Sequence, residues 1–313
     1  MLSSDIVTKD RIDSTGFIFV LILTMLWGVN YFAIKVSCAG FSPIFTSFIR
    51  SVAASACGVI YCLAVRQPLF HRDIRLFHGF MVGLLFGAEF VCLYLGMLYT
   101  NATRAAVFVY LSPFVVAIGA HMFLGERLNA IKVISLIFAF FGVYLVFKGK
   151  PLLHARSMLL GDSLEIMAAI FWGATTLYIK KYLAERVHPI NTFLYQLVFS
   201  VPLIFVCAYF LEPVWVVGAL TSGVFWSLFY QSIVVAFASF LVWFKLIHAY
   251  PVASLAVFTF LTPIFGVASG ALFLGEDLTR GLVIGLICVC IGIYGTNHRK
   301  PVRSPAPSAI TQK

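Results

Sequence analysis

Long runs of apolar residues, separated by short polar connectors, follow one another along almost the whole chain. A helix that crosses a bilayer needs roughly 17–25 mostly uncharged residues, and these runs have that length. Their apolar residues are continuous and do not alternate with polar ones, so a β-barrel is not indicated. The pattern predicts an all-α integral membrane protein with ten transmembrane helices, at residues 17–37, 44–65, 78–98, 103–124, 130–148, 160–181, 190–211, 224–247, 252–274 and 281–297.

Two stretches of the sequence occur twice, in the same order and at nearly the same offset. WGVNYFAIK at 27–35 and WGATTLYIK at 172–180 are identical in four of nine positions. YLSPFVVAIGAHMFLGERL at 110–128 and FLTPIFGVASGALFLGEDL at 260–278 are identical in seven of nineteen positions. Two such matches in one chain indicate an internal duplication.

The duplication divides the chain into two homologous halves, residues 17–148 and 160–297, which a loop at 149–159 joins. Each half has five spans. Because five is odd, a half begins and ends on opposite sides of the membrane, and its copy has to insert upside down. Inverted repeats of this kind occur in many secondary transporters, which bind their substrate near the midplane between the repeats.

Composition supports a membrane protein and narrows its chemistry. The 313 residues are 61% hydrophobic and 11% charged, with a mean hydropathy of +1.00, whereas globular domains carry about 25% charged residues. The sequence has no GxxxxGK[ST] phosphate loop, no HExxH motif and no persuasive nucleophile–base pair, so we expect neither an enzyme nor a cofactor. Six of the seven cysteines fall in apolar spans without the spacing of a zinc site, so we expect them to fill the core.

The net charge of +10 indicates the orientation of the chain and not a nucleic-acid partner. Cytoplasmic loops of membrane proteins are enriched in Lys and Arg. If both termini are cytoplasmic, fifteen Lys and Arg lie in the segment 1–16, the cytoplasmic loops and the tail 298–313. The opposite loops and helix ends hold six, several of them in KGKPLLHARS, the loop that argues against this orientation. We therefore predict two cytoplasmic termini, with a disordered, Pro/Ser-rich tail.

These features together resemble a known family. The ten spans, the WG-containing first span of each half and the P…FLGE motifs of the fourth and ninth spans are similar to the drug/metabolite transporter superfamily, EamA type. The resemblance covers about residues 16–297. It implies a bacterial inner-membrane carrier that exports amino acids, metabolites or toxic compounds through a central cavity lined by both halves. It says little about the substrate.

One carboxylate lies near the centre of a predicted span. Glu89 is in the third span, where a charge costs about 2.5–3.5 kcal/mol on insertion scales, so it should face a cavity or a partner or be protonated. Its counterpart in the second half is Ser239. We expect Glu89 to contact a substrate amine or to couple transport to protons; the alternative is a structural hydrogen bond to a neighbouring helix.

The first span of each half carries three polar or aromatic residues at positions i, i+3 and i+4, which share one helix face. These faces could form two walls of one substrate pocket, or they could pack helices together, as small polar residues also do. The residues are Trp27, Asn30 and Tyr31 in the first half and Trp172, Thr175 and Thr176 in the second. We expect Gly28 and Gly173 to allow close helix packing.

Pro113 and Pro263 fall near the centres of the fourth and ninth spans. Each lacks an amide donor and leaves the carbonyl four residues earlier without its helical partner. They could be hinges for alternating access or fixed kinks. Tyr110 and Thr259, one turn away, are expected on the cavity wall.

Other polar residues are assigned mainly structural roles. Gln231 in the eighth span could contact a substrate or have a structural role. Lys35 and Lys180 end matching spans and are expected to reach the membrane interface. Glu126 and Glu276, which close the two FLGE motifs, are expected to cap or pair a loop. Arg50 and Arg104 are expected toward the outer side, where either could guard an exit or pair with a headgroup.

The sequence therefore predicts a secondary transporter that moves a small organic metabolite across the bacterial inner membrane by alternating access. An amino acid or a related amphipathic compound is the first expected substrate, and export is the expected direction. An importer or a drug or lipid carrier of the same fold is the alternative. A non-transporting membrane sensor or assembly protein is the alternative from another class. The expected partners are a small-molecule substrate, the lipid bilayer and, as candidate coupling ions, protons; a homodimer is left open.

Overall fold

The computed structural model describes residue 9 and residues 11–99, 108–147, 157–274 and 280–297. Over these residues the chain forms helices and one isolated β-bridge, between Phe41 and Val216. Six of the described helices are long and apolar enough to cross a membrane, and four shorter apolar helices accompany them. The prediction of an all-α protein is confirmed for the described residues.

The helices follow the predicted spans closely, with three exceptions. In the fourth span the described residues break at Tyr110 and Leu111, before the helix that begins at Ser112. The other two are in the second half. The eighth span passes through a π-helix, and the ninth is split into two helices. The first half contains α1 (Ser14–Ser37), α2 (Pro43–Ala64), α3 (Ile74–Tyr99), α5 (Ser112–Phe123) and α6 (Ala130–Phe147); the second contains α7 (Ser157–Tyr182), α8 (Pro189–Leu211), α9 (Ser222–Phe229), the π-helix η1 (Tyr230–Ser239), α10 (Phe240–Ala249), α11 (Val252–Phe258), α12 (Leu261–Leu274) and α13 (Arg280–Asn297).

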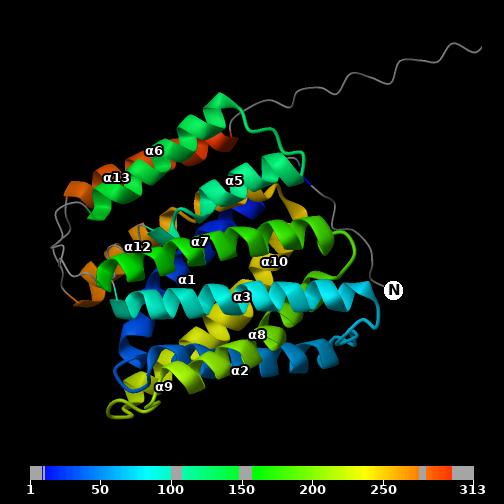
Figure 1. Ribbon diagram of the computed structural model, residues 1–313. Coiled ribbons are helices and arrows are strands. Elements are labelled where there is room, and N and C mark those ends of the chain that lie inside the picture. The colour runs from blue at the N-terminus through cyan, green and yellow to red at the C-terminus, as the bar shows by residue number, and fades with distance from the viewer. Residues whose placement is uncertain (1–8, 10, 100–107, 148–156, 275–279, 298–313) are drawn as a thin grey trace, which may run out of the picture.

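Most helix packing joins one half of the chain to the other (Figure 1). α3 lies against α7 and α8, α2 against α8, α1 against α12, and α6 against α13. Contacts between helices of the same half, such as α2 with α3, are less extensive. The core of the protein is therefore formed by the two halves together.

At one end of the bundle, a carboxylate from the second half caps a helix of the first half. Glu212, which follows α8, accepts hydrogen bonds from the Ser42 hydroxyl at 2.7 Å and from the amides of Ile44 and Phe45 at 2.7 and 2.9 Å. The first amides of a helix have no partner within the helix. Glu212 therefore satisfies the start of α2, and we call this end of the bundle the Glu212 end.

At the opposite end, Lys180 holds the turn between α10 and α11. Its ammonium donates to the carbonyl oxygens of Ile247, His248 and Tyr250 at 2.9, 3.2 and 3.1 Å. The last carbonyls of a helix lack helical partners and attract cations. The expectation that Lys180 reaches the membrane interface was wrong, because its charge is used to close this helix end; Lys35 is exposed.

Two further side chains hold the same turn. The amide of Val252 donates to the Glu126 carboxylate at 3.0 Å, so Glu126 caps α11 as predicted. The Tyr250 hydroxyl donates to Asp13 at 2.6 Å, and Asp13 also caps α1 by accepting from the Gly16 amide at 2.9 Å. We call this end of the bundle the Asp13 end. Burial raises the pKa of the Glu126 carboxyl above its ordinary value.

Both prolines stand just after a break in their helix. Pro113 lies in the first turn of α5, directly after the non-helical residues Tyr110 and Leu111. Pro263 lies in the first turn of α12, after the break that ends α11 at Phe258. There the Thr262 amide donates to the Thr259 carbonyl at 3.0 Å, so the group that Pro263 cannot bond still finds a partner. Glu276 and Arg104 lie outside the described residues.

Candidate functional site

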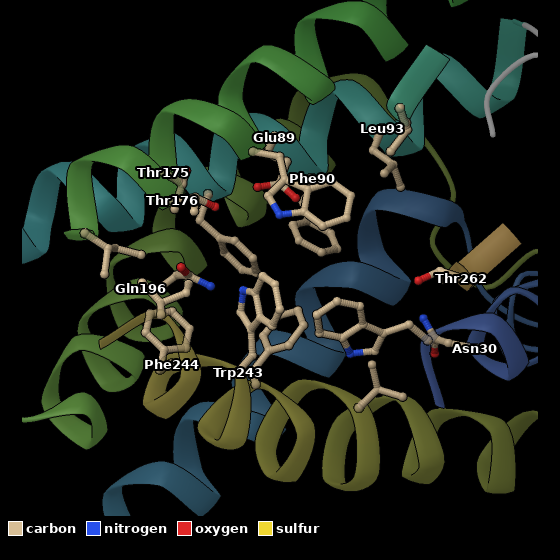
Figure 2. A pocket seen from close by; sticks show the side chains of 18 of the residues that line it. Asn30, Glu89, Phe90, Leu93, Thr175, Thr176, Gln196, Trp243, Phe244 and Thr262 are labelled. Atoms are coloured by element: carbon tan, nitrogen blue, oxygen red, sulfur yellow. The ribbon is translucent and has the colours of Figure 1, made fainter. Parts of the chain in front are cut away.

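A cavity of about 130 Å³ lies between the two halves of the chain. The residues that line it come from α1, α2 and α3 of the first half, from the residues before α5, and from α7, α8, η1, α10 and α12 of the second half. The bulk of the cavity wall is aromatic or aliphatic, and a few polar side chains interrupt it (Figure 2). Concave, mainly apolar sites with few polar groups are typical of small-molecule binding.

Aromatic rings form one wall of the pocket. The Trp27 ring meets the rings of Trp243 and Phe240 edge to face, with centroids 5.2 and 6.0 Å apart. The Trp27 indole N–H donates to the Ser239 hydroxyl at 2.8 Å, which fixes the orientation of the ring. Tyr110, from the first half, meets Trp172, from the second half, at 6.3 Å. The wall is thus drawn from both halves of the chain.

A positive and a negative side chain both line the pocket. Arg50 of α2 is 1% exposed and Glu89 of α3 is 7% exposed, and the two are not joined by an ion pair among those of the described residues. The guanidinium carbon of Arg50 lies 4.2 Å from the centroid of the Phe90 ring. Its Nε and Nη2 atoms are buried without a hydrogen-bond partner. Leaving a buried charged donor unpaired is costly, so these two atoms are the exception to be explained at this site.

Three more lining side chains hold a buried polar atom without a hydrogen-bond partner. They are the amide oxygen of Asn30 and the hydroxyls of Thr175 and Thr262. In the view of Figure 2, Thr175 and Glu89 lie on one side of the aromatic rings, and Asn30 and Thr262 lie on another. Polar groups from α1, α3, α7 and α12 therefore surround one space, which is the arrangement that a polar or charged ligand needs.

Seven of the ten residues expected at the substrate site line the pocket. They are Trp27, Asn30, Glu89, Tyr110, Trp172, Thr175 and Thr176. Tyr31 belongs to α1, but its side chain lies outside the described residues. Whether the seven bind a substrate stays a prediction; the structure brings them together around one cavity.

Gln231 and Thr259 lie away from the pocket lining. The Gln231 amide donates to the Ala33 carbonyl at 3.2 Å and to the Ser37 hydroxyl at 2.8 Å, so it joins η1 to α1. The Thr259 hydroxyl donates to the Ala256 carbonyl at 2.7 Å, at the break between α11 and α12. The structure thus gives both side chains hydrogen bonds that stabilise the helices.

Sequence reasoning missed several lining residues. Arg50, expected toward the outer side, faces the pocket instead. Gln196 and Thr262 are polar residues within apolar helices, as are Glu89 and Gln231. Trp243 could not have been selected, because one aromatic residue among many in this chain carries no sign of its direction. Among the described residues, no group of three or more His, Cys, Asp or Glu could hold a metal ion.

Comparisons of the sequence and of the fold identify known proteins that resemble this chain. The EamA-like transporter family matches residues 14–148 and 159–298. The uncharacterized transporter YoaV of Bacillus subtilis is 24% identical over 88% of this chain and 94% of its own length. A probable amino-acid metabolite efflux pump of Escherichia coli is 25% identical over 91% of this chain and 97% of its own.

One solved crystal structure, 16% identical, superposes with a TM-score of 0.78 over 90% of this chain and 96% of that chain, so it shares the fold. Because the family matches nearly the whole length in two consecutive copies, the chain belongs to the EamA-like transporter family.

Proposed function

We propose that this transporter carries a small zwitterionic metabolite, an amino acid or a related amphipathic compound, outward across the bacterial inner membrane by alternating access. The observation that carries the proposal is the pair of opposite charges in one aromatic pocket. Arg50 can bind a carboxylate with two parallel hydrogen bonds, and Glu89 can bind an ammonium group. The rings of Trp27, Trp172 and Trp243 would surround an apolar side chain.

The zwitterion fits this pocket better than a lipid or a hydrophobic drug. Neither Arg50 nor Glu89 belongs to the ion pairs found among the described residues, which join Lys9 to Asp13 and Arg75 to Asp73. An apolar ligand would leave both buried charges without a hydrogen-bonded partner, which is costly at this depth. The name of the Escherichia coli relative, a probable amino-acid metabolite efflux pump, supports the same substrate class and the outward direction.

We infer an inverted pair of repeats from matching helix contacts. A Cβ on Gly28 of α1 would lie 2.6 Å from the Cβ of Phe265 in α12. A Cβ on Gly173 of α7 would lie 2.5 Å from Val115 of α5. Phe265 and Val115 occupy equivalent positions of the second repeated stretch, so exchanging the two halves exchanges these contacts. Such symmetry supports a mechanism in which the halves alternate between two related arrangements.

The proposed orientation places the Asp13 end of the bundle at the cytoplasm. The distribution of Lys and Arg, fifteen against six, favours two cytoplasmic termini. The turn between α10 and α11, held by Lys180, Glu126 and Asp13, would then close the pocket from the cytoplasmic side. Pro113 and Pro263, next to the helix breaks, remain the proposed hinges.

Counterflow in proteoliposomes tests this function. Liposomes loaded with unlabelled L-phenylalanine or L-leucine are diluted into the same labelled amino acid, and uptake is followed without any ion gradient. We expect transient accumulation of label, and competition by other zwitterions but not by the matching amine or acid that lacks one charge. No counterflow with any amino acid of a full panel would contradict the proposal and favour a sensor or assembly protein.

Glu89 offers the sharpest single substitution. Replacing Glu89 by Gln removes the negative charge but keeps the size, so we expect counterflow of amino acids to fall at least about tenfold, as for loss of a charged hydrogen bond. The control Glu185→Gln makes the same change on an exposed carboxylate and should leave counterflow unchanged. Equal counterflow in Glu89→Gln and wild type would remove Glu89 from the site.

Direction is tested in cells. Expression of an exporter should raise resistance to toxic amino-acid analogues supplied as dipeptides, because the released analogue leaves the cell. Expression of an importer should lower resistance to the free analogue and support growth on an external amino acid.

A further inference from the structure

A second buried carboxylate, outside the pocket, has no role in the account so far. Glu165 of α7 is 0% exposed, and neither of its two carboxylate oxygens has a hydrogen-bond partner. It lies seven residues before the pocket residue Trp172, about 10 Å along the helix axis, and fifteen residues before Lys180. Glu165 is therefore on the Glu212 side of the pocket.

Glu165 lies in the interface between α3 and α7, one of the most extensive helix contacts in the protein (Figure 1). A Cβ on Gly96 of α3 would lie 2.5 Å from the Oε1 atom of Glu165. The absence of a side chain at Gly96 thus leaves the room that the carboxyl group occupies. A small residue at a helix contact would ordinarily bring two backbones together, but here it makes space for an ionisable group.

The surroundings of Glu165 contain no positive charge among the described groups that act on it. Asp162, one turn earlier on α7, is 6% exposed and adds negative charge. From α3, the titratable group nearby is the thiol of Cys92. On α5, which also packs against α7, the titratable group is His121, at the end of α5 next to Glu126 and on the side of Lys180.

Three glutamates are buried among the described residues, and their surroundings differ. Glu212 accepts three hydrogen bonds and caps α2. Glu89 lines the pocket, and the guanidinium of Arg50 lines the same cavity. Among the described residues Glu165 has neither a hydrogen-bond partner nor a basic side chain acting on it, and a carboxylate without either is not stable as an anion in a low-dielectric interior. When two carboxyl groups have such different surroundings, they are suited to different tasks.

We propose that Glu165 is the proton-binding site that couples transport to the proton gradient, while Glu89 binds the substrate. In the arrangement described here the carboxyl group holds a proton and is neutral. Separation of α3 from α7 at the Glu212 end would admit water from that side, and the carboxyl group would exchange its proton with it. In the alternate arrangement, with the Asp13 end open, the carboxyl group would exchange its proton with water that enters through the pocket from the other side. A proton taken up on one side and released on the other would thus cross the membrane once per cycle, in exchange for substrate. The inference rests on the proposed transport function.

The experiment compares gradient-free with gradient-driven transport in the same proteoliposomes. Wild type, Glu165→Gln and the control Glu185→Gln are first assayed by counterflow of labelled L-phenylalanine and L-leucine without a gradient. They are then assayed for accumulation against a concentration gradient after a pH jump, with trapped pyranine to report proton movement. Thermal unfolding of each purified variant shows whether it is folded.

We expect all three proteins to show counterflow, and wild type and Glu185→Gln to accumulate substrate when a pH gradient is imposed. Glu165→Gln, which imitates the neutral carboxyl group permanently, should lose the accumulation and the pyranine signal while it keeps counterflow. The variant Glu165→Asp retains a titratable group and should retain pH-driven accumulation, so it replaces Glu165→Gln if the latter does not fold.

Three results would overturn the proposal. They are pH-driven accumulation by folded Glu165→Gln at the wild-type level, no response of wild type to a pH gradient, and a sodium gradient that drives accumulation in place of protons. The absence of counterflow in wild type would instead contradict the transport function itself, so the two failures are distinguishable.

Discussion

Several polar atoms around the pocket are buried without a hydrogen-bond partner. They belong to Arg50, Asn30, Thr175 and Thr262. Elsewhere in the described bundle, side chains such as Ser37 and Thr296 donate to a carbonyl three or four residues earlier in their own helix, although other buried atoms, among them the Tyr94 hydroxyl and the Glu165 carboxylate oxygens, also lack a partner. A free buried polar group costs about 1–3 kcal/mol, so the convergence of several on one cavity supports the proposed ligand binding.

Arg50 provides a test at this scale. Replacing Arg50 by Gln removes the guanidinium, so we expect the affinity for an amino acid to fall roughly 10- to 100-fold, since a hydrogen bond to a charged group contributes about 1.5–3 kcal/mol. The amine that lacks the carboxylate should bind the variant and wild type equally, if weakly. Binding is measured by isothermal calorimetry in detergent. Equal losses for both ligands would show that Arg50 supports the fold and not the carboxylate.

At the scale of helices, the turn between α10 and α11 is held by side chains from three other parts of the chain. Lys180, Glu126 and Asp13 reach it from α7, from the segment between α5 and α6, and from the start of α1. These elements belong to both halves. The turn can therefore move only when contacts between the halves are broken, which suits a closed gate.

Lys180 is the residue whose loss should loosen this turn. Lys180→Met removes three hydrogen bonds to helix-terminal carbonyls but keeps the length of the side chain. We expect hydrogen exchange of the amides in 247–252 to become at least about tenfold faster, because the local opening free energy falls. Lys180→Arg should restore most of the protection. Unchanged exchange in Lys180→Met would mean that the other contacts suffice to hold the turn.

Helix packing also depends on glycine at one repeated position. Gly28→Ala would place a Cβ 2.6 Å from Phe265 and 2.8 Å from the Gly266 amide nitrogen, so α1 and α12 must separate. We expect a loss of roughly 1–3 kcal/mol in the free energy of unfolding, measured by chemical unfolding in micelles. Gly223→Ala is the matched control, because its nearest neighbours lie at 3.7 Å. Equal stabilities of the two variants would contradict the close contact.

At the scale of the whole molecule, the sequence predicted the parts that depend on composition and repetition. The apolar runs predicted the helices, and the repeated WG and FLGE stretches predicted two halves. Seven of ten candidate residues line the pocket because polar residues at midplane depth are rare and face inward. The role of Lys180 and the direction of Arg50 were not predictable, because they depend on how helices of one half meet helices of the other.

Two local features also escaped the sequence. The π-helix η1 changes the direction of the side chains that follow it, including Trp243, and periodicity arguments assume a regular helix. Glu165 is, like Glu89, an acidic residue within a span, and it lies near the start of the sixth span. Burial alone distinguishes it.

The central claim is that the pocket between the halves holds the substrate and opens to each side of the membrane in turn. Thr176→Cys, introduced into a cysteine-free variant, places a thiol on the pocket wall, and Thr259→Cys places one outside it as a control. We predict that membrane-impermeant thiol reagents label Thr176→Cys from either side, that an amino-acid substrate protects it, and that Thr259→Cys is not labelled. Labelling of Thr176→Cys from one side only, or labelling that no amino acid slows, would contradict the account.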